Sequence, residues 1–245
     1  MHSCFLDEPL REGLFSLSAE ESAHVARVLR MHSGEPVRLL DGKRLWEGQI
    51  ESVAEKAVVV RAVRALPSPE PHARVTLYQG MPKADKLELI AQKATELGAW
   101  AVQPVIMERS IGKEKNSEAR QERMRRIALE AAKQAGRAHV PEVCPARTLG
   151  KLADDLRGQE LLLLAWEEAR DVHLSRALTD YWQAHNRLPE RVGVIIGPEG
   201  GVSSAEAAQL TELGAIPITL GQRILRTETA ALCCLSVLMA LLDEL

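Results

Sequence analysis

The sequence predicts an α/β protein in which a mostly parallel, helix-covered sheet follows a small β-rich domain. Beyond residue 72, apolar runs of strand length alternate with helical stretches, as in parallel sheets. Before residue 67, three β-like runs follow a single helix. The segment "PSPEPH" between these parts has three prolines within five residues and is typical of a linker. We therefore expect domains at 1–66 and 73–245, joined by a linker at 67–72.

In the first domain, "SLSAEESAHVARVLRMHSGE" predicts a helix that is capped at Ser18 and ends near Gly34. Ser18 and Glu21 have the spacing of a capping box, and the apolar residues after them recur at helical intervals. The β-like runs that follow are "PVRLLDG", "RLWEGQIESV" and "KAVVVRAVRAL". Because Asp41-Gly42 is typical of a tight hairpin turn, we expect the first two of these strands to pair.

The second domain contains five strand-like runs: "RVTLYQG", "AWAVQPVIM", "ELLLLAW", "RVGVIIG" and "AIPITLG". The first of its expected helices has Pro82 near its start and Gly98 as its stop. The next, "SEARQERMRRIALEAAKQAGR", ends at Gly136. Another begins around Ser203, with Glu206 three residues later, and the apolar stretch "TETAALCCLSVLMALLDEL" predicts the last helix.

Composition narrows the function classes. The 245 residues are 46% hydrophobic, enough for a sizeable core, but only 3% aromatic, which disfavours a broad stacking surface for single-stranded nucleic acid. The net charge of −3 gives no global attraction to nucleic acid, so such binding must rest on local patches. The sequence shows no signal-peptide core, no run of membrane-spanning length, and no CxxC or metal-ligand spacing among its cysteines. We expect a cytoplasmic protein that uses neither a membrane nor a metal.

The loop "GPEGG" at Gly197–Gly201 stands between a strand and a helix, where open parallel sheets bind ligands. Its spacing fits neither the P-loop pattern GxxxxGK[ST] nor the dinucleotide pattern GxGxxG. Both patterns cradle phosphate at a helix N-terminus, where Glu199 would repel an anion. An uncharged or cationic ligand fits better, since glycines let a ligand approach main-chain groups closely. The alternative is a tight strand-to-helix turn without a ligand.

A second glycine turn, "LGQRILRTETA", follows the next strand and opens the last helix. Two such loops at strand ends favour a ligand site. Thr227 is a good N-cap residue, and Glu228 occupies the favoured first turn. A capped helix with a surface ion pair would explain these two residues in part. It would not explain Arg223 and Arg226, which could grip an anionic or carbonyl-rich substrate.

Together, "IGPEGGVSSAE" and "LGQRILRTETAAL" closely resemble the signature of the ribosomal RNA small-subunit methyltransferase E family, in the SPOUT superfamily of S-adenosylmethionine-dependent enzymes. Three further motifs are similar to those of the family, so the resemblance covers nearly the whole chain. These motifs are "HVARVLR", "MPKADKLELIAQKATELG" and "RIALEAAKQAGR".

The resemblance implies an N-terminal PUA-like β-barrel that binds RNA, followed by an α/β domain with helices on both faces of its sheet. It also implies a deep trefoil knot in the second domain, which pattern alone would not predict because true knots are rare. The implied activity is methylation of N3 of one uridine in 16S ribosomal RNA, preferably within the assembled small subunit, by a homodimer. The implied donor, S-adenosylmethionine, carries a sulfonium cation and no phosphate, so an acidic loop is compatible with it.

The resemblance also assigns site residues. Those expected to bind the donor are Leu164, Trp166, Glu167, Ile196, Gly197, Pro198, Glu199, Gly200, Gly201, Leu220, Gly221, Ile224, Leu225, Arg226, Thr229 and Ala230. We hypothesise that Arg226 or Arg223 stabilises charge on the deprotonated uracil, and that Glu228 orients the guanidinium or accepts the proton. The candidates for RNA contact are Arg27, Arg30, Arg38, Lys83, Arg123 and Arg126. For the basic helix, internal ion pairs such as Glu122 with Arg126 are the alternative.

Two other functions stay open. A SPOUT enzyme that methylates a ribose 2′-hydroxyl would use the same donor, but such relatives typically have a Ser-Leu-Asn-rich turn where this chain has "RILRTETA". A non-catalytic RNA-binding assembly factor could keep the donor site as a remnant, although the intact glycine loops and both arginines argue against it. A product methylated on the base would favour the main hypothesis, whereas a product methylated on the sugar would favour the first alternative.

Overall fold

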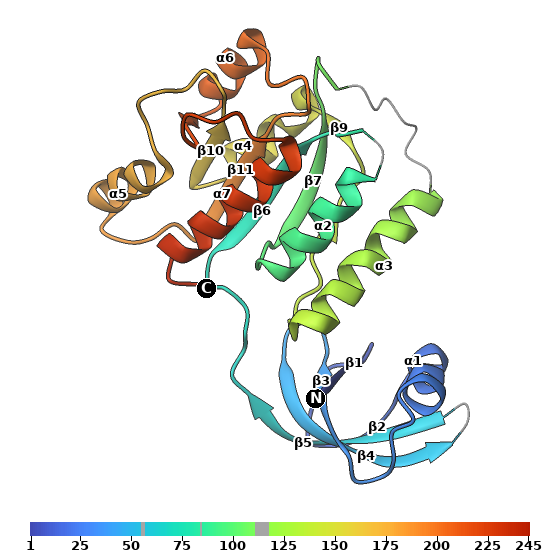
Figure 1. Cartoon of the computed structure of the whole chain (residues 1–245). Helices are drawn as coiled ribbons and strands as arrows, with labels where there is room; N and C mark the ends of the chain where they lie inside the picture. The colour runs from blue at the N-terminus through green and yellow to red at the C-terminus, as the bar shows by residue number, and fades with distance from the viewer. Residues whose placement is uncertain (55–56, 84, 111–117) are drawn as a thin grey trace. The chain divides into compact units, whose positions relative to one another are not determined.

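The computed structural model describes residues 1–54, 57–83, 85–110 and 118–245 (Figure 1). The chain divides into two compact units. The first contains Met1–Glu70 and Leu129–Val140, and the second contains Pro71–Ala128 and Pro141–Leu245. The boundary between residues 70 and 71 falls within the predicted linker 67–72, whereas residues 129–140, predicted in the second domain, group with the N-terminal unit.

The N-terminal unit is built on a five-stranded sheet in the order β1-β3-β4-β5-β2, counted over the described residues. Its strands are β1 (His2–Phe5), β2 (Gly13–Ser16), β3 (Pro36–Leu40), β4 (Leu45–Ala54) and β5 (Ala57–Leu66). As the sequence predicts, β3 and β4 pair antiparallel across the Asp41-Gly42 turn. Asp41 stabilises this turn, since its Oδ1 accepts hydrogen bonds from the backbone N–H groups of Lys43 and Arg44.

The predicted N-terminal helix is shorter than expected. Ser18 caps α1 (Ala19–Ala23), its hydroxyl accepting from the Glu21 N–H at 3.2 Å. The chain then changes to a π-helical turn, His24–Val28, instead of continuing to Gly34. The expected reciprocal bond of the capping box is replaced, because the Glu21 carboxylate contacts His2 and Lys133. Hydrophobic periodicity does not distinguish these two kinds of helical turn.

The C-terminal unit contains, within the described ranges, a seven-stranded sheet with all pairs parallel. The strand order is β12-β10-β11-β6-β7-β8, with β9 also beside β7. The strands are β6 (Arg74–Gly80), β7 (Ala101–Ile106), β8 (Glu142–Val143), β9 (Arg147–Thr148), β10 (Leu161–Ala165), β11 (Arg191–Ile196) and β12 (Ala215–Ile218). The five predicted strand runs all appear, while β8 and β9 are additional.

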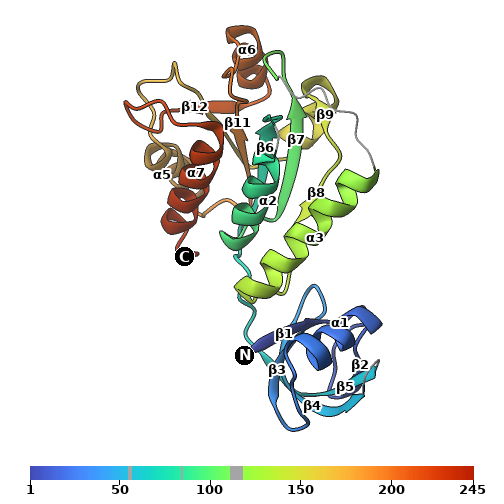
Figure 2. The ribbon, with the colours of Figure 1, turned by 45° about the vertical axis from the view of Figure 1, so that its right-hand side comes forward.

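Helices cover both faces of this sheet, as predicted. They are α2 (Lys86–Glu96), α3 (Glu118–Ala135), α4 (Ala153–Arg157), α5 (Leu174–His185), α6 (Ser204–Glu212) and α7 (Thr227–Leu241), with a 3-10 turn at Leu149–Leu152. On one face, Leu162 and Leu164 of β10 share a core with Leu156 of α4 and Leu210 of α6. On the other, α7 packs against β11 and lies beside α2 (Figures 1 and 2). The predicted α/β class is confirmed.

Parallel pairing aligns the carboxyl ends of the central strands. Ala165 at the end of β10 is paired with Ile196 of β11 and with Ile218 of β12, and Ile196 is paired with Gln79 of β6. The segments that follow these strands therefore all leave the sheet at the same edge. In open α/β sheets this is the edge at which ligands bind.

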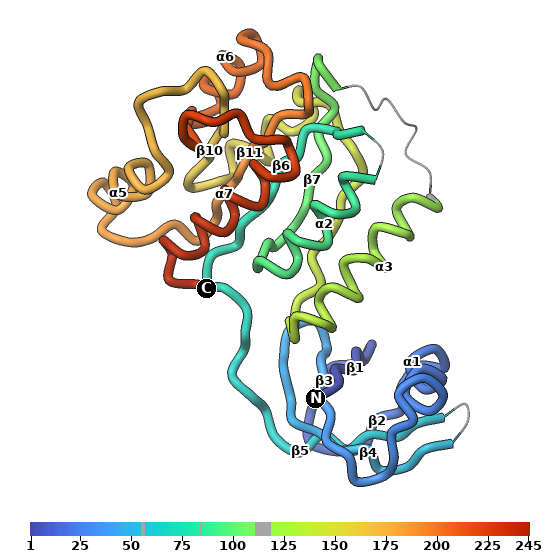
Figure 3. Tube along the Cα trace, viewed as in Figure 1, coloured from blue at the N-terminus to red at the C-terminus, as the bar shows by residue number. Residues whose placement is uncertain are grey.

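The last helix of the C-terminal unit returns toward the start of β6 (Figure 3). The carboxylate of Glu244 accepts a 2.8 Å hydrogen bond from the His72 N–H and a longer one from that of Ala73. Within the described ranges, no helix combines the length and the apolar character that crossing a bilayer requires.

Candidate functional site

The Gly197–Gly201 loop packs so tightly against its neighbours that two glycine positions, Gly80 and Gly201, have no room for a side chain. A Cβ on Gly80 of β6 would lie 2.5 Å from the backbone nitrogen of Pro198. Gly201 has φ +75°, and a Cβ there would lie 2.0 Å from Oε1 of Glu167. The loop is therefore held against the ends of β6 and β10 by contacts that only glycine permits.

The helix after this loop begins as the sequence predicts. Ser203 caps α6 in a capping box: its hydroxyl accepts from the Glu206 N–H, and the Glu206 carboxylate accepts from the Ser203 N–H. The indole Nε1 of Trp166, just beyond β10, donates to the carbonyl of Val202 at 3.3 Å. These contacts join the segment after β10 to the segment after β11.

The carboxylate of Glu199 is bound by the segment that opens α2. It accepts a hydrogen bond from the Lys83 N–H at 3.1 Å and pairs with Nζ of Lys86 at 3.1 Å. The same Lys86 nitrogen lies 3.1 Å from Oε2 of Glu228, in the first turn of α7. One ammonium group thus pairs with an acid in the Gly197–Gly201 loop and with an acid in the helix that directly follows the second glycine loop.

These contacts shift the ionisation of both acids in the same direction. Burial alone would raise the pKa of Glu199, but its own backbone N–H and the Lys86 ammonium outweigh burial and hold the pKa below its ordinary value. The pKa of Glu228 is lowered in the same way, against burial, by its backbone N–H, by Lys86 and by the charge of Arg226. Both carboxylates are ionised at neutral pH.

Thr227 connects the two glycine loops through its hydroxyl, which donates to the carbonyl of Gly197 at 2.6 Å. The same oxygen accepts from Nε2 of Gln79 at 2.8 Å, and both side chains are buried. The expectation that Thr227 is the N-cap of α7 is wrong, because Arg226 holds that position and Thr227 is the first helical residue. Its hydroxyl bonds to another loop instead of to its own helix.

The second loop, 219–226, is much less enclosed. Gly221 has φ +103°, and its N–H donates to the Thr219 hydroxyl. The side chain of Ile224 is 89% exposed. Arg223 and Arg226 are exposed, and neither guanidinium forms a hydrogen bond or ion pair with any residue that the structure describes. The two predicted cations are therefore available to an external anion.

The structure places most of the predicted donor-binding residues at this one edge, but in different environments. Leu164 and Ile196 are buried strand residues, so only their main chain could reach a ligand. The others lie in the segments that follow β10, β11 and β12, or in the first turn of α7. Half-buried members are Trp166, Gly197, Gly201, Leu220, Leu225 and Ala230, and exposed members are Glu167, Glu199, Gly200, Gly221, Ile224, Arg226 and Thr229. Pro198 is buried.

Sequence reasoning missed two polar residues of this edge, Lys86 and Gln79. Lys86 is the first residue of α2, where the helix dipole disfavours a cation, so its position was a signal of a nearby acid. Gln79 is a polar residue in the otherwise apolar strand run "RVTLYQG", which signals a buried hydrogen bond.

The predicted RNA contacts are divided between the two units. Arg123 pairs with Glu88 at 2.7 Å, and Arg126 pairs with Glu122 at 3.4 Å, so these cations of α3 are partly neutralised. Lys83 holds Glu199 through its N–H, and its side chain points to solvent. In the N-terminal unit, Arg27, Arg30 and Arg38 are all exposed. Arg30 has φ +53° and borders a surface hollow with Met31, His32 and Val53.

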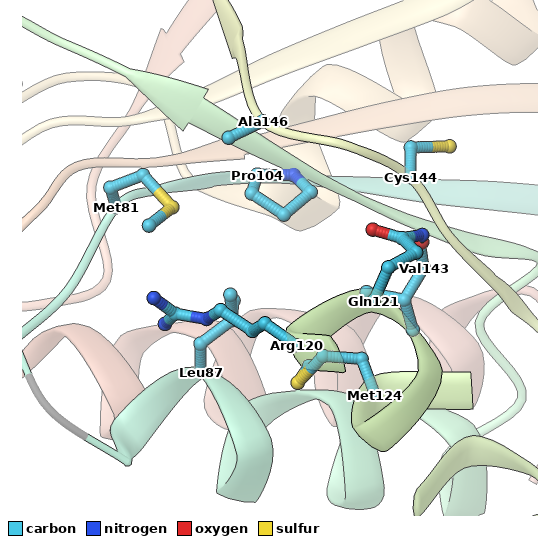
Figure 4. Close-up of a pocket in the computed structure, with 9 residues that line it drawn as sticks. All are labelled: Met81, Leu87, Pro104, Arg120, Gln121, Met124, Val143, Cys144 and Ala146. Atoms are coloured by element: carbon cyan, nitrogen blue, oxygen red, sulfur yellow. The ribbon is translucent and has the colours of Figure 1, made fainter. Parts of the chain in front are cut away.

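A small pocket lies elsewhere in the C-terminal unit, between α2, α3 and the end of β7 (Figure 4). It shares no residue with the predicted donor site. Its lining is formed by Met81, Leu87, Pro104, Arg120, Gln121, Met124, Val143, Cys144 and Ala146. The Gln121 side-chain amide donates to the Val143 carbonyl across the pocket, so these two polar groups are already paired with each other.

One group of potential metal ligands occurs among the described residues of the N-terminal unit: His2, Cys4 and Glu21. Nζ of Lys133 lies 2.6 Å from Oε2 of Glu21. Burial, with a further contribution from the Glu21 charge, raises the pKa of Cys4 to about 12, so its thiol is protonated. The group has the chemistry of a buried ion pair, and the need for no metal stays a prediction.

Comparison with known proteins identifies the family to which this geometry belongs. The pattern described as an RNA methyltransferase domain matches residues 68–239, and that of an RNA methyltransferase PUA domain matches residues 17–63. The ribosomal RNA small subunit methyltransferase E of Bacillus subtilis is 34% identical over 236 residues, which cover 91% of this chain and 89% of the relative. The chain belongs to the ribosomal RNA small subunit methyltransferase E family.

A further relative and two solved structures are similar to this chain over nearly its whole length. The relative of the same name from Synechocystis is 32% identical, and the match covers 97% of this chain and 76% of that protein. A methyltransferase structure from Legionella pneumophila, in complex with the cofactor S-adenosylmethionine, is 32% identical with a TM-score of 0.80, covering 97% and 96%. The methyltransferase E structure of Neisseria gonorrhoeae, bound to S-adenosylmethionine, is 27% identical with a TM-score of 0.83, covering 98% of each chain. The expected PUA-like and SPOUT-type fold is confirmed.

Proposed function

We propose that this RNA methyltransferase binds S-adenosylmethionine at the strand-end edge and methylates N3 of a uridine in 16S ribosomal RNA of the small subunit. The observation that carries the proposal is the meeting of three strand-end segments around glycine main chain, the third of which has two arginines without an ion pair to any described residue. The relatives that bind this cofactor, and those that carry the small-subunit name, support it.

The residues of the edge fit this cofactor on two observations. Gly201 keeps the main chain bare because a side chain there would strike Glu167. The Glu167 carboxylate makes no hydrogen bond or ion pair with any described residue, so it can accept from hydroxyl or ammonium groups. When bound, the cofactor supplies an electrophilic methyl group on a sulfonium centre. The residues that would hold it are those predicted in the segments after β10, β11 and β12.

Arg223 and Arg226 are the residues we assign to the uracil. Loss of the N3 proton leaves negative charge that is shared by the ring oxygens. A guanidinium placed beside those oxygens lowers the energy of that anion, and neither arginine must first break an ion pair with a residue that the structure describes. Stabilising the anion also makes the proton easier to release to solvent.

Glu228 is better suited to positioning than to proton removal. Its pKa lies below the ordinary value despite burial, because its own N–H, Lys86 and Arg226 all favour the carboxylate. A carboxylate with a lowered pKa is a weak base. Its charge instead attracts the Arg226 guanidinium at the N-terminus of α7. We therefore keep the orienting role for Glu228 and not the base role.

The remaining features implied by the family belong to the same proposal. We propose a trefoil knot formed by the segments around Gly197–Gly201 and 219–226, a homodimer, and a cytoplasmic location on the assembling or assembled small subunit. The apolar helix α7 supports an interface as well as a core. Leu235 and Leu238 are fully buried, whereas Val237 and Leu241 are 42% and 40% exposed. Light scattering of the purified protein tests the dimer.

The reaction is tested by transfer of labelled methyl from S-adenosylmethionine. The substrates are small subunits from cells that lack the matching activity, with free 16S ribosomal RNA in parallel, and the product is identified by nucleoside analysis. N3-methyluridine is the expected product. A 2′-O-methylated nucleoside would move the enzyme to another SPOUT reaction, and no transfer despite cofactor binding would mean that the substrate is wrong.

The catalytic assignment is tested by Arg226→Ala and Arg223→Ala. Loss of one charge-stabilising donor is expected to lower kcat by about 100-fold, with the Kd for S-adenosylmethionine changed by only a few-fold. Arg176→Ala is the matched control, since Arg176 is exposed on α5 and pairs only with Asp180 among the described residues. If Arg226→Ala keeps a rate within a few-fold of wild type while cofactor binding is unchanged, the assignment is wrong.

A further inference from the structure

We infer that Lys86 is a positioning residue that fixes the two glycine-bearing segments at the separation needed to bind the cofactor. The inference rests on the proposed function, because it names a residue that acts through Glu199 and Glu228 on the same site. Lys86 touches neither glycine loop by main-chain hydrogen bonding. It acts through its ammonium group, which is shared by two carboxylates from distant parts of the chain.

Lys86 links three elements through a single atom, its side-chain nitrogen. Nζ lies 3.1 Å from Glu199 and 3.1 Å from Glu228, and the lysine itself begins α2. The three side chains are 31%, 23% and 17% exposed, so the ion pairs are partly shielded from water. Partly buried pairs are screened by salt less than exposed ones.

Without the ammonium group, the two carboxylates would face each other. Each lies within contact distance of the same nitrogen, so they are close enough for like charges to repel. One is on the loop after β11 and the other is in the first turn of α7, so their repulsion would push the two segments apart. The Thr227–Gly197 hydrogen bond joins the same two segments and would resist that separation.

The position of Lys86 in its helix supports a role outside α2. A lysine at the first position of a helix meets the positive end of the helix dipole, which is unfavourable. The carboxylates of Glu199 and Glu228 therefore have to offset this unfavourable interaction. Lys93, in the last turn of the same helix, shows the ordinary arrangement, since it pairs with Glu96 one turn away at 2.8 Å. Among the described residues, that pair joins no other element.

The test compares Lys86→Met and Lys86→Arg with the wild type and with Lys93→Met as the matched control. Lys86→Met keeps the length of the side chain and removes the charge, whereas Lys86→Arg keeps the charge and can span both acids. Three quantities are measured on the full chain: amide hydrogen exchange of 197–201 and 219–226 without cofactor, the Kd for S-adenosylmethionine by calorimetry, and the KM for RNA.

We expect Lys86→Met to speed exchange in both segments and to weaken cofactor binding at least 10-fold, with the KM for RNA changed less than two-fold. Lys86→Arg is expected to bind within about three-fold of wild type, because one guanidinium can satisfy two carboxylates. Lys93→Met is expected to match wild type in all three measurements. Equal exchange in Lys86→Met and wild type, or a Kd within two-fold of wild type, would overturn the inference.

A further variant covers the case in which Lys86→Met folds poorly. Lys86→Met combined with Glu228→Gln removes one of the two repelling charges and should recover the thermal stability, but cofactor binding should stay weak because the link is still missing. If the double variant recovers both thermal stability and cofactor binding, Lys86 only neutralises charge, which contradicts a positioning role. Hydrogen exchange decides the inference even if the wild type binds no S-adenosylmethionine, an outcome that would refute the proposed function alone.

Discussion

The two glycine loops look equivalent in sequence but differ in how the rest of the molecule holds them. The Gly197–Gly201 loop is fixed by close packing on Gly80, by the Thr227 hydroxyl and by Lys86. The 219–226 loop has an exposed isoleucine and two exposed arginines without a described partner. One loop is preformed by its own contacts, and the other presents its side chains to solvent.

This difference suggests a division of labour. A preformed loop loses little conformational entropy when a ligand binds, so it suits the cofactor, which must be held in one orientation. An exposed loop with free cations suits a large anionic substrate that supplies the missing contacts. The predictions below test whether these particular contacts hold the Gly197–Gly201 loop in place. They also test whether the exposed side chains of the 219–226 loop contribute to stability.

The largest expected effect is that of Gly80→Ala. A Cβ at this position would lie 2.5 Å from the backbone nitrogen of Pro198, which cannot rotate away, so the fixed loop must shift. Overpacking of this kind costs about 1–3 kcal/mol of unfolding free energy, and we also expect cofactor binding to be lost. Denaturant unfolding and calorimetry measure the two effects. Gly150→Ala is the control, since no atom lies within 4 Å of its added Cβ, and a similar loss there would show that the contact is irrelevant.

A smaller loss is expected for Thr227→Val, which keeps the shape of the side chain and removes its hydroxyl. The Gly197 carbonyl then lacks its 2.6 Å donor, and the Gln79 amide lacks one acceptor. The loss of such a hydrogen bond lowers the free energy of unfolding by about 1 kcal/mol. Thermal unfolding measures it, with Thr179→Val on the exposed surface of α5 as the control, because its hydroxyl only bonds within the helix. Equal melting temperatures for the two variants would mean that the bond between the loops contributes nothing.

Much of this architecture was accessible from sequence because it depends on local patterns. Alternation of apolar runs and helices predicted the parallel sheet, and the Ser203–Glu206 spacing predicted a capping box that the structure contains. Helix α5 was missed although its buried residues Leu174, Ala177, Leu178 and Tyr181 recur at helical spacing. Strands β8 and β9 have two residues each, too few for any periodicity to be seen.

The contacts that fix the first loop were not accessible in the same way. Lys86 and Glu228 are far apart in the sequence, and periodicity carries no information about pairs at such separation. The sequence correctly marked Thr227 as a residue with a special role, but propensity assigned its hydroxyl to its own helix instead of to Gly197. Local rules found the loops, and tertiary packing decided which of them is rigid.

Acid should weaken the ion pairs that Lys86 forms with Glu199 and Glu228. The pKa values of Glu199 and Glu228 are lowered in the folded state, so their contribution to stability is complete above the ordinary glutamate pKa and is lost as pH falls through the lowered values. The pKa of Lys86 is raised by its ion pairs with Glu199 and Glu228, so its contribution is complete at neutral pH and is lost only in strong alkali. The link is thus intact from about pH 5 to about pH 10.

The lowered pKa of Glu228 predicts how the stability of the variant Glu228→Gln depends on pH. Because Gln resembles a protonated carboxyl, the difference in melting temperature between wild type and Glu228→Gln should be constant from about pH 6 to about pH 8.5 and should shrink below about pH 4. A difference that instead grows in acid would mean that the carboxylate is not stabilised by Lys86 in the folded state.

The smallest effect on stability is expected for Ile224→Ser in the exposed loop. Because the side chain is 89% exposed, its loss should change the unfolding free energy by less than about 0.5 kcal/mol. Cofactor affinity should fall about three-fold if the loop covers the bound donor as proposed, since a small apolar contact is lost. Leu188→Ser, 44% exposed in the turn after α5, is the control and should change neither quantity. A marked loss of stability in Ile224→Ser would show that the second loop is held as firmly as the first, and the contrast between them would fail.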